Sequence, residues 1–144
     1  MIFWDKLKSL TVLYERLTED VKNEYHLTQL EFDILMFLYN NPQYKTASDI
    51  VRAKRLTKSH VSASVASLKK KGLLKGNYLA GNQKNIYLTL TPATSEIISA
   101  GKIAQAEYGD VLARGFSGTE KNEIKDLFLR LCENADRELN RRIS

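Results

Sequence analysis

The stretch of sequence that decides the fold is Thr57-Lys-Ser-His-Val-Ser-Ala-Ser-Val-Ala-Ser-Leu-Lys-Lys-Lys-Gly-Leu-Leu74. Because a helix turns by about 100° per residue, Val61, Val65 and Leu68 fall within one narrow sector and predict a helix seated on a core. The opposite face carries mostly small polar residues, and Gly72 is suited to end the helix as a C-terminal cap. Such a helix can bring its backbone close to a large partner.

Positive charge is concentrated around this helix. Between Lys45 and Lys84 the chain has ten Lys or Arg residues and one acidic residue, Asp49, whereas the remainder of the chain is net acidic. The whole chain has 144 residues and a formal net charge of +5. A basic block inside an otherwise acidic chain favours a surface that binds nucleic acid.

The segments on either side of the helix predict a winged helix-turn-helix. Thr46 and Asp49 mark the start of a short helix over residues 47–53, and only a few residues separate it from Thr57. After the basic helix, apolar residues alternate with polar ones up to Leu90, and residues 80–83 have the composition of a turn. A β-hairpin in this position is a wing.

The rest of the chain predicts helices. An apolar stripe runs over residues 3–21, and a Thr28–Glu31 capping box opens a helix that is apolar nearly all round. Pro92 starts a long helix that ends near residue 114, and a last helix follows over residues 117–140. The expected fold class is therefore mainly α with a small β-hairpin, in one domain of residues 1–144 with a winged core at residues 27–91.

The exposed face of the basic helix carries the residues expected to read DNA. Ser59, His60 and Ser62 can donate or accept hydrogen bonds at base edges, while Ala63 offers only apolar contact, for example with a thymine methyl group. Since no arginine lies on this helix, we expect an A·T-rich site. The full set expected to contact DNA is Lys45, Arg55, Thr57, Lys58, Ser59, His60, Ser62, Ala63, Lys70, Asn82, Gln83 and Lys84.

Other classes of protein find little support. The chain has no Gly-x-Ser-x-Gly, glycine-rich phosphate loop or His-Glu-x-x-His, so neither an enzyme nor a cofactor is expected. The single cysteine, Cys132, excludes an intrachain disulfide, and the two histidines have no cysteine near them, so no metal site is expected. No apolar stretch is long enough to span a membrane, which favours a cytoplasmic protein.

The order of these elements resembles the MarR family of bacterial transcriptional regulators. The resemblance covers nearly the full chain. Its most specific pieces are Leu27-Thr28-Gln29, Lys58-Ser59-His60-Val61-Ser62, Leu68-Lys-Lys-Lys-Gly-Leu73 and Leu90-Thr91. The resemblance implies a homodimer in which residues 1–22 and 92–144 form the dimerisation helices and two wings read a pseudo-palindrome of double-stranded DNA. It also implies repression, with release by a small lipophilic or phenolic effector.

Two features stay open within this resemblance. Aromatic and methionine side chains between the two regions are candidates for an effector pocket, although such residues also serve as plain core: Tyr14, Phe32, Met36, Tyr39 and Tyr108. The wing has Asn82 and Lys84 where the family often has Asp and Arg, and lysine lacks the planar fork that arginine presents to a minor groove. The alternative hypothesis is a winged-helix module that binds protein and has no DNA specificity.

Overall fold

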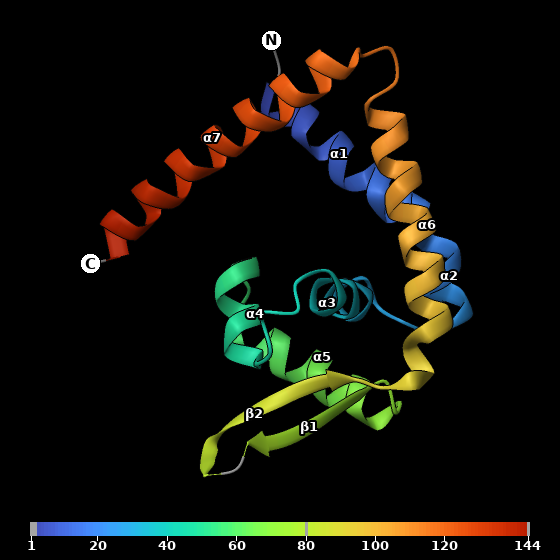
Figure 1. The fold of residues 1–144 in the computed structure, drawn as a ribbon, viewed down its shortest axis with the longest axis vertical. Helices are drawn as coiled ribbons and strands as arrows, with labels where there is room; N and C mark the ends of the chain where they lie inside the picture. Colours follow the sequence, from blue (N-terminus) through green and yellow to red (C-terminus); the bar gives the residue numbers. More distant parts are fainter. Residues whose placement is uncertain (1–2, 80, 144) are drawn as a thin grey trace. The chain divides into compact units, whose positions relative to one another are not determined.

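The computed structural model describes residues 3–79 and 81–143, and the side chains of residues 79 and 82–84 lie outside this description. The chain divides into two compact units, Met1–Tyr108 and Gly109–Ser144. The expected boundary at residues 91 and 92 falls inside the first unit. The elements (Figure 1) are α1 Phe3–Leu17, α2 Glu19–Glu24, α3 Gln29–Asn40, α4 Ala47–Lys54, α5 Lys58–Lys70, β1 Leu74–Leu79, β2 Asn82–Leu90, the 3-10 turn Pro92–Thr94, α6 Ser95–Leu112 and α7 Gly118–Ile143.

The N-terminal helix is not continuous as the apolar stripe over residues 3–21 indicated. It is interrupted at Thr18, between α1 and α2, and the second piece runs on to Glu24. Thr18 is fully buried, and its hydroxyl donates to the carbonyl oxygens of Tyr14 and Glu15. A threonine hydroxyl that bonds back to the preceding turn often bends a helix, and the break falls at this residue.

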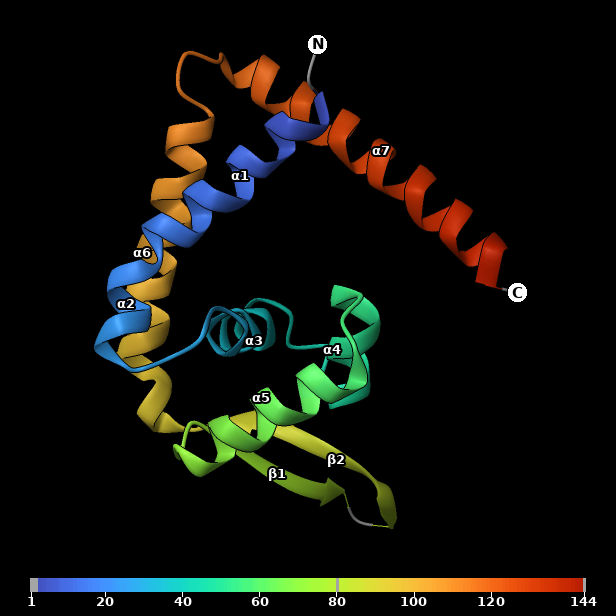
Figure 2. The same cartoon turned by 180° about the vertical axis from the view of Figure 1, so that it is seen from behind.

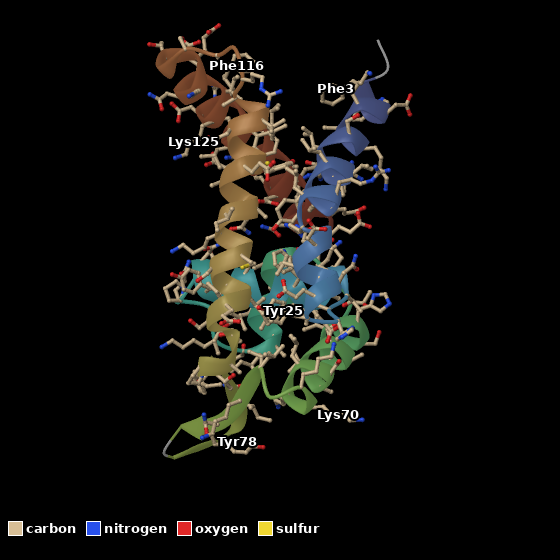
Figure 3. The ribbon with its side chains drawn as sticks, turned by 90° about the vertical axis from the view of Figure 1, so that its right-hand side faces the viewer. Phe3, Tyr25, Lys70, Tyr78, Phe116 and Lys125 are labelled. Carbon is tan, nitrogen blue, oxygen red and sulfur yellow. The ribbon has the colours of Figure 1, made fainter. Side chains whose placement is uncertain are left out.

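Within the first unit, α6 lies beside α1 and α2 (Figure 2). The Tyr25 hydroxyl donates to Glu96 at 3.2 Å, and Figure 3 shows Tyr25 beside α6. Near the middle of α6, Gly101 is buried, and a Cβ added there would lie 2.5 Å from Met36 Sδ. The glycine therefore does not break the helix; it lets α6 approach α3 closely.

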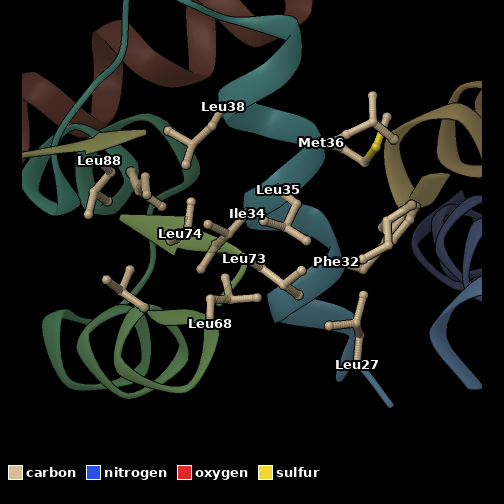
Figure 4. Packing of buried hydrophobic residues seen from close by; sticks show 14 of the residues in the cluster. Leu27, Phe32, Ile34, Leu35, Met36, Leu38, Leu68, Leu73, Leu74 and Leu88 are labelled. Atoms are coloured by element: carbon tan, nitrogen blue, oxygen red, sulfur yellow. The ribbon is translucent and has the colours of Figure 1, made fainter. Parts of the chain in front are cut away.

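The core of the first unit gathers around α3. Along this helix, Phe32, Ile34, Leu35 and Met36 are at most 1% exposed. Figure 4 shows Phe32 and Met36 pointing toward α6, while Ile34 lies among Leu68 of α5, Leu74 of β1 and Leu73 between them. The predicted stripe is confirmed, because Val61, Val65 and Leu68 are all buried. Both faces of α3 are thus occupied, as its all-round apolar sequence indicates.

The wing is the antiparallel hairpin β1–β2, in which Leu74 pairs with Leu90 and Tyr78 with Ile86. The register shifts between Tyr78 and Leu79, so that Leu79 pairs with Asn82. Gly81 has a positive φ of 82°, as a tight turn requires. The turn is shorter than the expected residues 80–83, because β2 begins at Asn82, and residue 80 lies outside the described residues. Leu88 is buried and Ile86 is 38% exposed, so the hairpin leaves the core as it approaches its tip.

The second unit consists mainly of α7, which begins with a capping box. Ser117 Oγ accepts from the Glu120 backbone N–H at 3.1 Å, and Glu120 Oε1 accepts from the Ser117 N–H at 2.9 Å. Within its described residues no side chain of α7 is buried, and seven large apolar side chains are exposed: Ile124, Leu127, Phe128, Leu129, Leu131, Leu139 and Ile143.

Candidate nucleic-acid interface

The helix α5 begins and ends at well-defined caps. Thr57 Oγ1 accepts from the His60 backbone N–H at 3.3 Å, which satisfies one of the free donors of the first turn. At the other end, Gly72 has a φ of +76°, its N–H bonds to Lys69 O, and the Leu73 N–H bonds to Leu68 O. This is a Schellman motif with the apolar contact that often accompanies it. The predicted cap at Gly72 is confirmed.

The outward face of α5 is formed by small and polar side chains. Lys58, Ser59 and His60 on the first turn are exposed, as are Ser62, Ala63, Ala66 and Lys70 further along the helix. The buried stripe lies on the other side, so the reading residues expected from the sequence do share one exposed face. With side chains this short, the helix backbone can approach a groove closely.

The residues before α5 are held by backbone contacts. Asp49 Oδ2 accepts the backbone N–H groups of Lys45 and Thr46, which with burial opposing them lower the pKa of the Asp49 carboxyl group. The Leu88 N–H donates to Lys45 O at 2.7 Å, so Lys45 is joined to β2. Arg55 lies exposed in the tight turn before α5, with a φ of 50°. The one acid of the basic block thus serves as a helix cap.

Three lysines end α5, and they differ in their surroundings. Lys69 and Lys70 are exposed, and Figure 3 shows Lys70 at the end of the first unit where Tyr78 also lies, far from Phe3. Lys71 instead forms an ion pair with Glu31 at 2.9 Å. A Cβ added at Gly76 would lie 2.9 Å from Lys69 Nζ, so the glycine leaves room for Lys69 to lie across the base of the wing.

Three other expected contacts lie at the wing tip. Asn82, Gln83 and Lys84 belong to β2 by their backbone, but their side chains lie outside the described residues. The prediction that they contact DNA therefore stays a prediction.

Lys54, which precedes the turn, is half-buried, and its Nζ lies 5.5 Å from the centroid of the Phe37 ring. This places Lys54 beside α3.

A cavity of about 440 Å³ opens between α1, α3 and α6. It contains three of the five residues expected to bind an effector: Tyr14, Met36 and Tyr108. Phe32 is fully buried in the core, and Tyr39 is exposed and lines a different hollow with Lys102. The remaining lining residues are mostly polar, and the sequence did not predict them because they belong to no local sequence pattern: Asp33, Phe37, Asn40, Asn41, Lys54 and Gln105.

Hydrogen bonds organise the polar wall of this cavity. The Tyr108 hydroxyl donates to Leu10 O at 2.8 Å, and Gln105 Nε2 donates to the Tyr14 hydroxyl at 3.0 Å. Burial raises the pKa of both tyrosines, so both remain protonated near neutral pH. Burial also raises the pKa of Asp33, although Gln29 Nε2 donates to its Oδ1 at 2.9 Å. The cavity offers aromatic edges together with hydroxyl, amide and carboxyl groups.

A sequence model described as MarR family matches residues 26–76, the segment that contains α3, α4, α5 and the start of β1. Over this segment the chain is similar to the MarR family. No curated protein matches the chain significantly.

Solved structures of the MarR family share the fold over nearly the whole chain. A putative MarR-family regulator from Listeria monocytogenes, complexed with 26mer DNA, has a TM-score of 0.84 at 19% identity, covering 96% of this chain and 91% of that one. A MarR protein from Peptoclostridium difficile has a TM-score of 0.83 at 15% identity, covering 96% of this chain and 90% of that one. The MepR–DNA complex of S. aureus has a TM-score of 0.78 at 17% identity, covering 94% and 98%. The winged fold expected from the sequence is confirmed.

Among the described residues, no helix combines the length and the apolar character needed to cross a membrane.

Proposed function

We propose that the protein is a homodimeric transcriptional regulator that binds double-stranded DNA through α5 and the wing. The observation that carries this proposal is the exposed face of α5, where short polar side chains are flanked by Lys58 and Lys70. The lysines contact phosphates and supply affinity, while Ser59, His60 and Ser62 contact base edges. The MarR-family match of residues 26–76 and the DNA complexes among the structural neighbours support the same function.

The site that fits this face is a pseudo-palindrome rich in A·T pairs. Bidentate guanine contacts come mostly from arginine and lysine, and α5 has only Lys58 near its reading end. Ala63 and Ala66 are suited to thymine methyl groups. Selection of bound sequences from random DNA would test this, and a G·C-rich core would contradict it.

Dimerisation follows from the apolar surface that the chain leaves exposed. Trp4 is 79% exposed on α1, Ile103 is 71% exposed on α6, and Leu131 is 62% exposed on α7. Apolar side chains in such numbers call for a partner surface, and a second copy would set two winged modules on the two half-sites. Sedimentation equilibrium would show a dimer at micromolar concentration.

A small effector would bind in the cavity that contains Tyr14, Met36 and Tyr108. Its mixed wall suits a lipophilic molecule with a phenolic or similar polar group, and binding there would weaken DNA affinity and relieve repression. Isothermal titration with simple phenols, using Met36→Trp to fill the cavity, tests this part of the proposal separately from DNA binding. Equal affinity of the variant and the wild type would place the effector elsewhere.

The main test is a mobility shift with the DNA upstream of the protein's own gene. About six phosphate contacts per dimer would give a slope near −5 when log affinity is plotted against log salt concentration. Failure to bind any duplex, even near about 50 mM salt, would favour a winged module that binds protein.

A further inference from the structure

A buried carboxylate joins the start of α3 to the end of α5. Glu31, in the first turn of α3, is 3% exposed, and its oxygens accept from the Thr28 backbone N–H at 2.9 Å and from Ser67 Oγ at 2.7 Å. Lys71 Nζ donates to both oxygens, at 3.1 and 2.9 Å. The capping box read from the sequence is therefore half of a larger cluster, whose other half comes from α5 and its C-cap.

Lys71 is partly exposed, but the donors of its ammonium group bond to oxygens of the protein. Besides the two bonds to Glu31, its Nζ donates to His26 O at 2.7 Å, in the connection between α2 and α3. An ammonium group has three N–H donors, so these three bonds account for all of them. Unlike its neighbour Lys70, Lys71 is not available to a phosphate without breaking this cluster.

The cluster adds a directional attachment at the C-terminal end of α5. Val61, Val65 and Leu68 seat one face of the helix on the core through apolar contacts, whereas the bonds from Ser67 and Lys71 to Glu31 require a defined position of that end. Ser67 lies eight residues after Ser59, about 12 Å along the helix. A tilt of about 10° at the C-terminal end would move Ser59 by about 2 Å, whereas functional contacts must be held to within roughly 0.5 Å.

We propose that Glu31, Ser67 and Lys71 form a clamp that sets the orientation of α5 for base reading, and that Lys71 contacts no DNA. The proposal rests on the DNA-binding function proposed above. It separates the lysines at the end of α5 into two roles: Lys70 binds phosphate, and Lys71 positions the helix. The clamp acts on specificity, because base contacts need an exact helix position while phosphate contacts tolerate some displacement.

The experiment compares Lys71→Met with Lys70→Met, a matched loss of charge on the adjacent residue, in the full-length protein. Fluorescence anisotropy measures affinity for an operator duplex and for a random duplex over a range of salt concentrations. We expect Lys71→Met to bind the operator about tenfold more weakly, with an unchanged salt slope and a reduced preference over random DNA. Lys70→Met should lower the slope by about one per subunit and leave the preference unchanged.

Two results would overturn the proposal. If the slope of log affinity against log salt concentration falls in Lys71→Met as it does in Lys70→Met, Lys71 contacts a phosphate. If Lys71→Met keeps the wild-type preference for the operator over random DNA, the clamp has only a structural role. Ser67→Ala, which removes one neutral donor, should show the same loss of preference to a smaller degree if Lys71→Met does not fold.

Amide hydrogen exchange without DNA provides an independent measurement. If the clamp holds α5 in place, the amides of α5 should exchange faster in Lys71→Met than in Lys70→Met when the two variants are compared at equal global stability. Equal exchange rates in α5 of the two variants would contradict the clamp. This readout stands even if the wild type binds no duplex, so failure of the clamp and failure of the DNA-binding proposal can be told apart.

Discussion

Replacing Gly101 by alanine tests the close approach of α6 to α3. The added Cβ would lie 2.5 Å from Met36 Sδ and 3.1 Å from both Met36 Cε and Phe32 Cζ. Phe32 and Met36 are 0% and 1% exposed, so neither can move into solvent. Overpacking of this kind destabilises by about 1–3 kcal/mol, while alanine in a helix regains about 1 kcal/mol relative to glycine.

The net expectation is a loss of about 1 kcal/mol for Gly101→Ala, since Met36 is flexible and borders a cavity that can receive part of its displacement. Gly109→Ala is the matched control on the same helix, because a Cβ there meets no other atom of the chain within 4 Å. That variant should gain about 0.5–1 kcal/mol. The two variants should therefore differ by about 2 kcal/mol, or roughly 4–8 °C in Tm.

Urea unfolding followed by circular dichroism would measure this difference at one fixed protein concentration, because the stability of a dimer depends on concentration. If Gly101→Ala proved as stable as Gly109→Ala, the packing of α6 on α3 would be loose, and the explanation given for Gly101 would be wrong. A secondary consequence is that Met36 would enter the cavity and reduce its capacity for a ligand.

Five further predictions concern DNA binding, pH and assembly. Ser62→Arg should shift the preferred site toward guanine when bound sequences are selected from random DNA. An unchanged preference would mean that Ser62 contacts no base edge. Lys84→Ala should weaken binding to all duplexes alike and lower the salt slope by about one per subunit, whereas loss of selectivity alone would contradict a phosphate role. Hydrogen bonds lower the pKa of Glu31 against the opposing effect of burial, so Glu31→Gln should be less stable than wild type above pH 4.5, and the difference should fade as the pH falls below that value. Burial raises the pKa of Asp33, so Asp33→Asn should be more stable than wild type at neutral pH and should lose this advantage as the pH falls toward 3.8. Acid titrations of stability measure both differences. Phe128→Glu should yield monomers in sedimentation and weaken operator binding, and a stable dimer would exclude that part of α7 from the interface.

Much of the fold was predictable because its signals are local. The capping boxes at Thr28 and Thr46 each involve residues three apart, and both form as expected. The stripe of α5 and the alternation of β2 are likewise short-range patterns. The break at Thr18 was missed, since a buried threonine that bonds back to its own helix leaves no mark in an apolar stripe.

The candidate site was predictable in part. The exposed face of α5 follows from helical geometry alone, so Ser59, His60 and Ser62 could be placed together without a structure. The polar wall of the cavity could not, because Asp33, Gln105 and Lys54 come from separate helices and none belongs to a recognisable motif.

By itself, the sequence determined that the chain forms a winged helix-turn-helix whose second helix lies in a basic block, because periodicity, caps and charge composition act within a few residues. Only the tertiary structure decided which charges remain available to a partner. Lys70 and Lys71 are neighbours of the same type, yet Lys71 meets Glu31, forty residues away in the chain, and Lys70 faces solvent. Gly101 likewise acquires its role only where Met36 packs on it. Contacts between distant segments depend on how whole helices pack, and no local pattern encodes them.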